Sequence, residues 1–392
     1  MRDGLLQNTP PTPPLGERPF PAERPVRRRV PPRPGPLAGT VRQWARALGW
    51  SAALGLVLAA APAGAQGAGA FSRMGLGARS LALPSQVADL SGHASPYLNP
   101  ALAPFQPAQG VELSAGLLSF DRTWEAVQVA APLRPASGFA GGVVHGGVDN
   151  IDGRDASGYP VDAPTADGTY SADEYAFFAA FGTRFSDAVS AGLGLRLYRT
   201  RLLEDVQAPT AIGVSAGLTA RLSPRLAAGI AVDDLFARYE WNESGPVSAS
   251  ETDYFPVRVR AGGAYGVGAF ESGRPRGVLL AEVEWSVQPA EATRPGGVET
   301  IGTEPSAREA RLDLTLADVQ ARAGGELWLT EAFAARVGID RVGAGEAGEL
   351  RPSAGFGLQQ RFEELDVRVD YAAVLEPFGT GIMHMATVRL GL

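Results

Sequence analysis

Two stretches of this chain match sequence patterns that carry chemistry in other proteins. Residues 213–217 read Gly-Val-Ser-Ala-Gly, the pattern that places a nucleophilic serine on a sharp turn between a strand and a helix. Residues 343–348 match G-x-G-x-x-G, whose glycines let a pyrophosphate approach the start of a helix. Here Ser215 lies inside an uninterrupted alternating pattern, and residues 349–352 lead into another strand. We therefore predict neither a catalytic residue nor a bound cofactor, and no enzyme.

Metal-ligand chemistry is not predicted either. The chain has no cysteine, and its histidines, His93, His145 and His384, lie far apart in the sequence. Carboxylates suit calcium or magnesium, and acidic residues gather between 149 and 174. They are Asp149, Asp152, Asp155, Asp162, Asp167, Asp173 and Glu174. Because Ile151 occupies a position where a calcium loop needs an oxygen ligand, we predict a solvated acidic loop.

Charged side chains also recur at alternate positions inside apolar stretches, which places them on one face of a strand. They are Arg184, Arg196, Arg221, Arg258, Arg260, Arg322, Arg336, Arg368 and Arg389, with Glu112, Glu282, Glu284, Glu326, Asp366 and Asp370. Opposite charges on neighbouring strands can pair in charge-assisted hydrogen bonds. Two interpretations stay open: structural pairing in a hydrated interior, or a polar route for a solute.

The elements that carry these residues show a period of two. Val189, Leu193 and Leu195 alternate with Ser190 and Arg196, and similar alternation recurs to the end of the chain. The pattern predicts strands at 110–118, 122–133, 138–148, 171–185, 188–203, 209–222, 225–235, 254–266, 276–287, 316–329, 332–342, 352–362, 364–375 and 382–392. A soluble β-sandwich also alternates, so alternation alone does not identify the architecture.

The connections between the predicted strands favour a membrane barrel. Tight turns at 186–187, 223–224, 330–331 and 363 alternate with long polar connections at 149–170, 236–253 and 288–315. Short turns on one side and long loops on the other are typical of outer-membrane barrels, whose two faces average to a mean hydropathy near zero, here −0.03. We predict an all-β fold: an antiparallel transmembrane β-barrel of about fourteen strands over residues 110–392.

The first 65 residues resemble a targeting segment rather than part of the folded protein. In residues 41–65, Arg42 and Arg46 precede an apolar core and an Ala-Gly-Ala site, which predicts a cleaved signal peptide and a mature start at Gln66. Residues 1–40 are rich in proline and arginine and predict a disordered leader or a misassigned start. The segment 1–65 carries nine arginines and three acidic residues, so its removal makes the net charge more negative than −7. An acidic mature chain disfavours nucleic acid as a partner.

Residues 69–105 resemble the N-terminal segment of PorV/PorQ-type proteins, relatives of the FadL-like transporters of hydrophobic compounds. The matching residues are Gly75, Gly77, Ala78, Arg79, Ala88, Asp89, Asn99, Pro100 and Ala101. Departures occur at Pro84 and Leu98 and in the absence of a glycine after Ala101. The resemblance implies that residues 66–109 fold into the lumen as a plug before a fourteen-stranded barrel; the alternative is a plain turn before the first strand.

The resemblance implies two functions between which the sequence does not choose. The first is a PorV/PorQ-like component of type IX secretion that holds or escorts secreted cargo proteins. The second is a FadL-like channel for hydrophobic small molecules, to which inward-facing Phe178 and Trp328 would contribute. A secreted β-sandwich is a third, disfavoured possibility. The expected location is the outer membrane, with lipid and the barrel-assembly machinery as partners, although Leu392 ends the chain where the assembly signal more often has an aromatic residue.

Overall fold

The computed structural model describes residues 68–153, 169–201, 209–242, 250–270, 275–294, 310–342, 350–376 and 380–392. The leader at 1–40, the signal-peptide segment at 41–65 and the predicted start at Gln66 lie outside the described residues. So do the glycine-rich stretch at 343–348 and three residues of the acidic loop, Asp155, Asp162 and Asp167.

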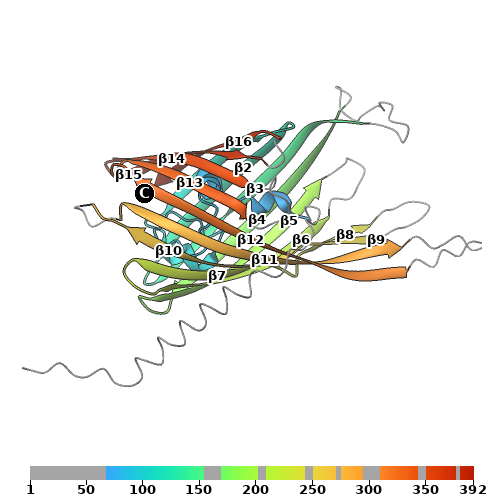
Figure 1. The fold of residues 1–392 in the computed structure, drawn as a ribbon, viewed down its shortest axis with the longest axis horizontal. Coiled ribbons are helices and arrows are strands. Elements are labelled where there is room, and N and C mark those ends of the chain that lie inside the picture. Colours follow the sequence, from blue (N-terminus) through green and yellow to red (C-terminus); the bar gives the residue numbers. More distant parts are fainter. Residues whose placement is uncertain are drawn as a thin grey trace, which may run out of the picture. The chain divides into compact units, whose positions relative to one another are not determined.

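Fourteen strands in the described part of the chain form a closed antiparallel barrel, which confirms the predicted fold (Figure 1). They are β1 (Gly110–Leu118), β2 (Arg122–Leu133), β3 (Ser137–Asp152), β4 (Thr169–Arg184), β5 (Val189–Arg201), β6 (Thr210–Arg221), β7 (Leu226–Leu235), β10 (Val257–Val267), β11 (Gly277–Arg294), β12 (Ala310–Trp328), β13 (Phe333–Val342), β14 (Arg351–Phe362), β15 (Leu365–Leu375) and β16 (Ile382–Gly391). Each strand pairs with its neighbours in sequence, except that β7 pairs with β10 and β1 pairs with β16. The β1–β16 pairing closes the barrel, so neither strand is left with an unpaired edge.

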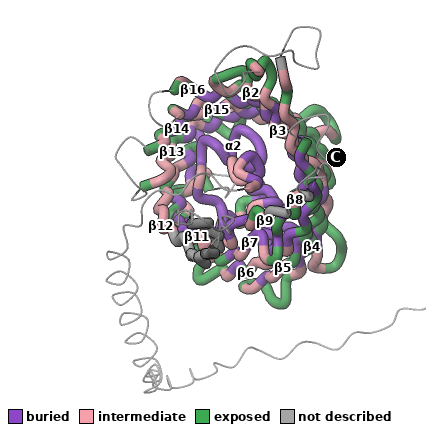
Figure 2. Tube along the Cα trace, turned by 90° about the vertical axis from the view of Figure 1, so that its right-hand side faces the viewer, coloured by how far each residue is buried: buried purple, intermediate pink, exposed green. Residues whose placement is uncertain are grey.

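Alternation along each strand sorts its side chains between lipid and lumen. In β5, Leu193 and Leu195 are 65% and 57% exposed on the outer face, whereas Arg196 is 3% exposed on the inner face. Leucine suits hydrocarbon, which cannot solvate a guanidinium group. Buried residues line the inside of the ring in Figure 2, and exposed ones its outside.

The tight turns share one device. The hydroxyl oxygen of Ser186 accepts hydrogen bonds from the backbone N–H groups of Ala188 and Val189, at 3.2 and 3.1 Å. Ser223 and Thr330 make the same pair of contacts two and three residues ahead. Such hydroxyl-to-backbone bonds stabilise short turns, which explains why Ser or Thr opens three of the predicted turns.

All three long connections predicted as loops contain strand residues; in the first, at 149–170, β3 extends to Asp152 and β4 begins at Thr169. The connection at 236–253 forms a two-stranded hairpin of β8 (Arg238–Asn242) and β9 (Ser250–Tyr254). The pairing of β11 with β12 extends to Arg294 and Ala310, far into the predicted 288–315 loop. A ladder needs only backbone donors and acceptors, so it continues where the apolar alternation has ended. β3, β4, β11 and β12 project beyond the barrel at the same end (Figure 1).

Three short helices precede the barrel: η1 (Ala70–Arg73), α2 (Gly77–Ala82) and η2 (Pro100–Phe105). η2 contacts β2 to β6, and α2 contacts β13 to β16 and β1. Residues 68–109 therefore run through the inside of the barrel, where α2 is visible within the ring (Figure 2). None of the helices in the described ranges is long and apolar enough to cross a membrane.

Candidate functional site

The lumen segment is held against one wall of the barrel by the Asn99-Pro100-Ala101 turn. The Asn99 side chain is fully buried. Its Oδ1 accepts from the N–H of Ala101 at 3.0 Å, and its Nδ2 donates to the carbonyl of Val87 at 2.7 Å. On the facing strands, a Cβ atom at Gly217 would overlap the Asn99 side chain, and one at Gly192 would overlap the backbone of Pro100. Glycine is thus required there for the turn to dock.

A second set of contacts joins the segment to the opposite wall through Arg79 of α2. Its Nη2 pairs with Asp89 Oδ2 at 2.7 Å, and its Nε pairs with Glu326 Oε2 of β12 at 3.0 Å. Gly75 and Gly77 have φ values of 104° and 83°, in the left-handed region that favours glycine. These two turns set α2 in place, and the N–H of Ala78 donates to Thr387 of β16 at 2.7 Å.

Glu326 is also the centre of a wider ion cluster. Arg336 Nε lies 2.7 Å from Glu326 Oε2, and Arg368 Nη2 lies 3.7 Å from the same oxygen. Asp370 neutralises both arginines, at 2.7 Å from Arg336 Nη1 and 2.9 Å from Arg368 Nε. All of these side chains are buried, so each charge depends on its partners rather than on water.

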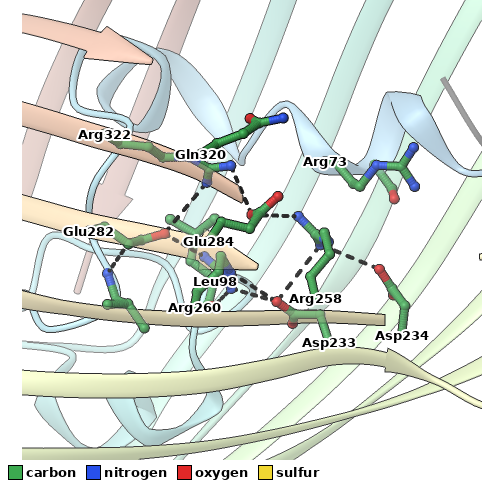
Figure 3. A network of polar contacts seen from close by, with 12 residues as sticks. Arg73, Leu98, Asp233, Asp234, Arg258, Arg260, Glu282, Glu284, Gln320 and Arg322 are labelled. Atoms are coloured by element: carbon green, nitrogen blue, oxygen red, sulfur yellow. Dashed lines mark hydrogen bonds and ion pairs between the residues drawn. The ribbon is translucent and has the colours of Figure 1, made fainter. Parts of the chain in front are cut away.

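A second ion cluster lies on β5, β7, β10, β11 and β12 (Figure 3). Asp233 contacts Arg196 at 3.1 Å and Arg260 at 2.7 Å, and Asp234 contacts Arg196 at 3.1 Å and Arg258 at 3.3 Å. Further along the wall, Arg322 pairs with Glu284 at 2.8 Å and with Glu282 at 3.5 Å. The sequence pattern singled out the arginines and glutamates of this cluster but missed both aspartates, Asp233 and Asp234.

The remaining lumen charges predicted from the sequence lie outside these clusters. Arg184 stacks on the ring of Phe105 at 5.9 Å, and Arg389 donates to Gln106 at 2.9 Å, so both touch the lumen segment. Asp366 accepts from Gln359 at 3.0 Å. Arg221 is exposed at the end of β6 and joins neither cluster.

Aromatic side chains cover the other part of the lumen. Tyr97 lies between the guanidinium of Arg196, 4.2 Å from its ring, and the ring of Phe178, 4.8 Å away. Phe255 packs at 4.5 Å from Tyr198 and at 4.9 Å from Tyr239 of the β8–β9 hairpin. These residues belong to one continuous buried cluster that also contains Phe71 and Trp124.

Burial and charge shift the pKa values of several groups on the lumen segment. Burial alone would lower the pKa of Arg79, but Glu326 and Asp89 hold it above its usual value. Burial, together with Arg368 and Arg79, lowers the pKa of His93 well below its usual value, which keeps that ring neutral. Burial raises the pKa of Tyr97. The segment therefore carries its positive charge on arginine alone.

Two small cavities lie between the lumen segment and the barrel in the described part of the chain. One cavity of about 40 Å³ lies beside η1, and another of about 10 Å³ lies beside α2. The first has room for roughly three waters and the second for about one. Among the described residues, no group of three His, Cys, Asp or Glu side chains is placed to hold a metal ion. Among the described residues, the lumen segment therefore occupies the inside of the barrel and leaves these two cavities beside η1 and α2.

Comparison with known proteins identifies the fold. No family model matches the sequence, and no curated protein matches it. Among solved structures, the toluene transporter TbuX of Ralstonia pickettii superposes with a TM-score of 0.54 at 13% identity, over 82% of this chain and 98% of that one. The Pseudomonas putida toluene transporter TodX superposes with a TM-score of 0.49 at 12% identity, over 81% of this chain and 96% of that one. A Pseudomonas aeruginosa FadL homologue superposes with a TM-score of 0.47 at 11% identity, over 76% of this chain and 93% of that one.

These identities are low, so the likeness shows the fold and not the activity. The comparisons do not confirm the finer resemblance to PorV/PorQ-type proteins. The fold of this chain is a closed fourteen-stranded antiparallel barrel similar to that of TbuX.

Proposed function

We propose that this protein is an outer-membrane channel for hydrophobic small molecules. This is the second of the two functions implied by the sequence resemblance, and the fold favours it: the superposition covers 98% of a protein described as a toluene transporter. The exposed apolar side chains on the outer face of the barrel would contact membrane lipid. The PorV/PorQ-like role in type IX secretion has no comparable support.

The observation that carries the proposal is the continuous aromatic cluster inside the lumen. It runs from Tyr239 and Phe255 at the β8–β9 hairpin to Phe178 and Trp124 on the barrel wall. This aromatic cluster covers the part of the lumen that the two ion clusters leave. An aromatic lining instead gives an apolar molecule favourable contacts along its path.

Within the lumen segment, η1 is the helix that lies beside these aromatic residues, through Phe71. Trp124 Nε1 donates to the carbonyl of Phe71 at 3.1 Å, and Tyr97, within the segment, donates to the carbonyl of Ser72 at 2.6 Å. α2 and η2, in contrast, are fixed by ion pairs and by glycine-lined strands. Displacement of η1 would therefore open the lumen while the two anchored helices stay in place.

Uptake of labelled toluene by cells that express the protein tests the proposal. Expression should raise toluene uptake above that of cells with the empty vector, while uptake of a labelled hydrophilic solute stays unchanged. Phe178→Gln should lower uptake about tenfold, because an amide without a partner on an apolar path costs roughly 1–3 kcal/mol. Phe178→Leu is the matched control and should retain most of the uptake.

Equal toluene uptake with and without the protein would refute the channel. The same strains distinguish the secretion role. If deletion of the gene left uptake intact and trapped secreted proteins in the periplasm, the PorV/PorQ-like function would replace the one proposed here.

A further inference from the structure

The cavity beside η1 is lined by an unusual number of cations. Six arginines from five elements face it, together with a single carboxylate, that of Asp340. The arginines are Arg73 of η1, Arg196 of β5, Arg258 and Arg260 of β10, Arg322 of β12 and Arg351 of β14. Ser72 and Ser80 add hydroxyl groups to the lining. A volume of about 40 Å³ surrounded by guanidinium groups is suited to an anion.

The neighbouring carboxylates do not fill this space. Asp233, Asp234, Glu282 and Glu284 bind the arginines from the barrel wall and are not part of the cavity lining. Figure 3 shows how these four carboxylates and the arginines of β10 and β12 are arranged. The cavity therefore meets the side of the cluster on which positive charge predominates.

Two of the lining arginines keep unused hydrogen-bonding capacity. Arg258 is 5% exposed, and its Nε has no hydrogen-bond partner among the described residues. The Nε of Arg351 is also buried without such a partner, and the carboxylate nearest to this residue, that of Asp340, is 3.9 Å from its Nη1. Buried N–H groups of charged residues are costly to leave unsatisfied. Both groups therefore call for an acceptor that the described residues do not supply.

Electrostatics at η1 agrees with this geometry. Burial and the charge of Arg258 lower the pKa of Arg73 to about 10. A lowered pKa means that the surroundings disfavour the positive charge on Arg73. A negative charge in the cavity would stabilise the positive charge on Arg73.

We propose that this cavity binds a small inorganic oxyanion, phosphate or sulfate. Guanidinium groups match the oxygen pairs of such ions in bidentate geometry, and several guanidiniums around one ion match its oxygens on all sides. A carboxylate that carried an alkyl or aromatic tail is disfavoured, because a space for roughly three waters has no room for the tail. The site does not rest on the channel function proposed above.

A bound oxyanion would act as a bridge between η1 and the barrel. Arg73 and Ser72 belong to the lumen segment, whereas Arg258 and Arg351 belong to barrel strands. The same ion can accept hydrogen bonds from both. Occupancy would therefore hold η1 in the position described here.

Equilibrium dialysis of the purified full-length protein in detergent tests the site, with labelled sulfate and labelled phosphate as probes at constant sodium chloride. We expect saturable binding of one ion per barrel. Arg351→Gln should weaken binding about tenfold by removing one charged donor. Arg389→Gln is the matched control, since Arg389 is also a lumen arginine but does not line this cavity.

The heat-modifiable band on gels will show that each variant is folded. Should Arg351→Gln fail to fold, Arg73→Gln serves instead, because Arg73 lies on the lumen segment and not in a barrel strand. Absence of saturable binding, or equal binding by wild type and the folded variant, would overturn the proposal. Binding of decanoate but of neither inorganic ion would also overturn it, in favour of a site for the head of a fatty acid.

Discussion

At the scale of single residues, Glu326 is a side chain on which the charges of three arginines depend. It holds Arg79 of the lumen segment and Arg336 of β13 through the same oxygen, and Arg368 of β15 lies close by. Glu326 is 4% exposed, so water does not take over when it is removed. Breaking a buried pair from one side is costly because it leaves the partner charge uncompensated.

We expect Glu326→Gln to destabilise the folded barrel by about 3–5 kcal/mol. Urea titration in lipid vesicles would measure the loss. Glu364→Gln, at an exposed turn residue, is the control and should change the free energy of unfolding by less than about 0.5 kcal/mol. The double substitution Arg79→Met with Glu326→Met should lower the free energy of unfolding by less than Glu326→Gln does, because it leaves no uncompensated charge at Arg79. A cost below 1 kcal/mol for Glu326→Gln would contradict the assigned role.

The residues of the ion clusters were only partly predictable from the sequence. Alternation placed Arg258 and Arg260 together on one face because they are two positions apart. The same rule places Asp233 and Asp234 on opposite faces, yet both are buried inside. Asp234 has a φ of 63°, and the β6–β7 register shifts between Val214 and Ala216. This local irregularity turns Asp234 inward, and the period-two alternation of side chains does not predict it.

At the scale of the strand, the register decides which side chains meet lipid. β5 offers the simplest test, since Leu195 is 57% exposed on the outer face and its neighbour Arg196 is 3% exposed within the lumen. A shift of the register by one residue would exchange the two environments.

Leu195→Arg should destabilise the inserted barrel by roughly 2–4 kcal/mol, because a guanidinium near the middle of the bilayer loses its hydration. The expected readout is slower insertion and loss of the heat-modifiable band. Leu195→Met keeps the outer face apolar and should insert like the wild type. Normal insertion of Leu195→Arg would show that this face does not meet hydrocarbon.

Sequence alternation located the transmembrane part of every strand but not the full length of all of them. Apolar alternation stops near Gln288, whereas the ladder of β11 and β12 continues through Arg294. Backbone pairing carries the extension, and it leaves no mark on side-chain type. The β8–β9 hairpin does alternate, with Tyr239 and Trp241 between Arg238 and Asn242, but five residues inside a polar connection are too short a signal to separate from a loop.

At the scale of the whole molecule, the closed state depends on how closely the lumen segment approaches the barrel wall. Gly192 and Gly217 lie on adjacent strands, and both face the Asn99–Ala101 turn without a side chain between them. The family resemblance implied that residues 66–109 enter the lumen. It did not indicate which strands receive each helix, because those contacts join residues far apart in the sequence.

Gly192→Leu should displace η2 while the barrel still closes, because the added side chain would overlap Pro100. We expect a higher single-channel conductance in planar bilayers and greater entry of hydrophilic antibiotics into cells. Gly263→Leu is the control: the nearest atom to a Cβ there is the carbonyl oxygen of Ala227 at 3.6 Å. Conductance that is equal in the two variants would argue against η2 as a seal.

The two ends of the lumen segment pack on strands from opposite ends of the barrel sequence. η2 packs on β2 to β6, which follow it closely along the chain, whereas α2 packs on β13 to β16 and β1. The bond from Arg79 to Glu326 of β12 spans 247 residues, whereas the bond from Ser190 of β5 to the carbonyl of Ala101 in η2 spans 89. Long separations carry a larger entropic cost of closure and form later. η2 can thus pack once the early strands have paired, whereas α2 packs only when the last strands are present. The lumen segment is therefore fully docked only after β16 has paired with β1.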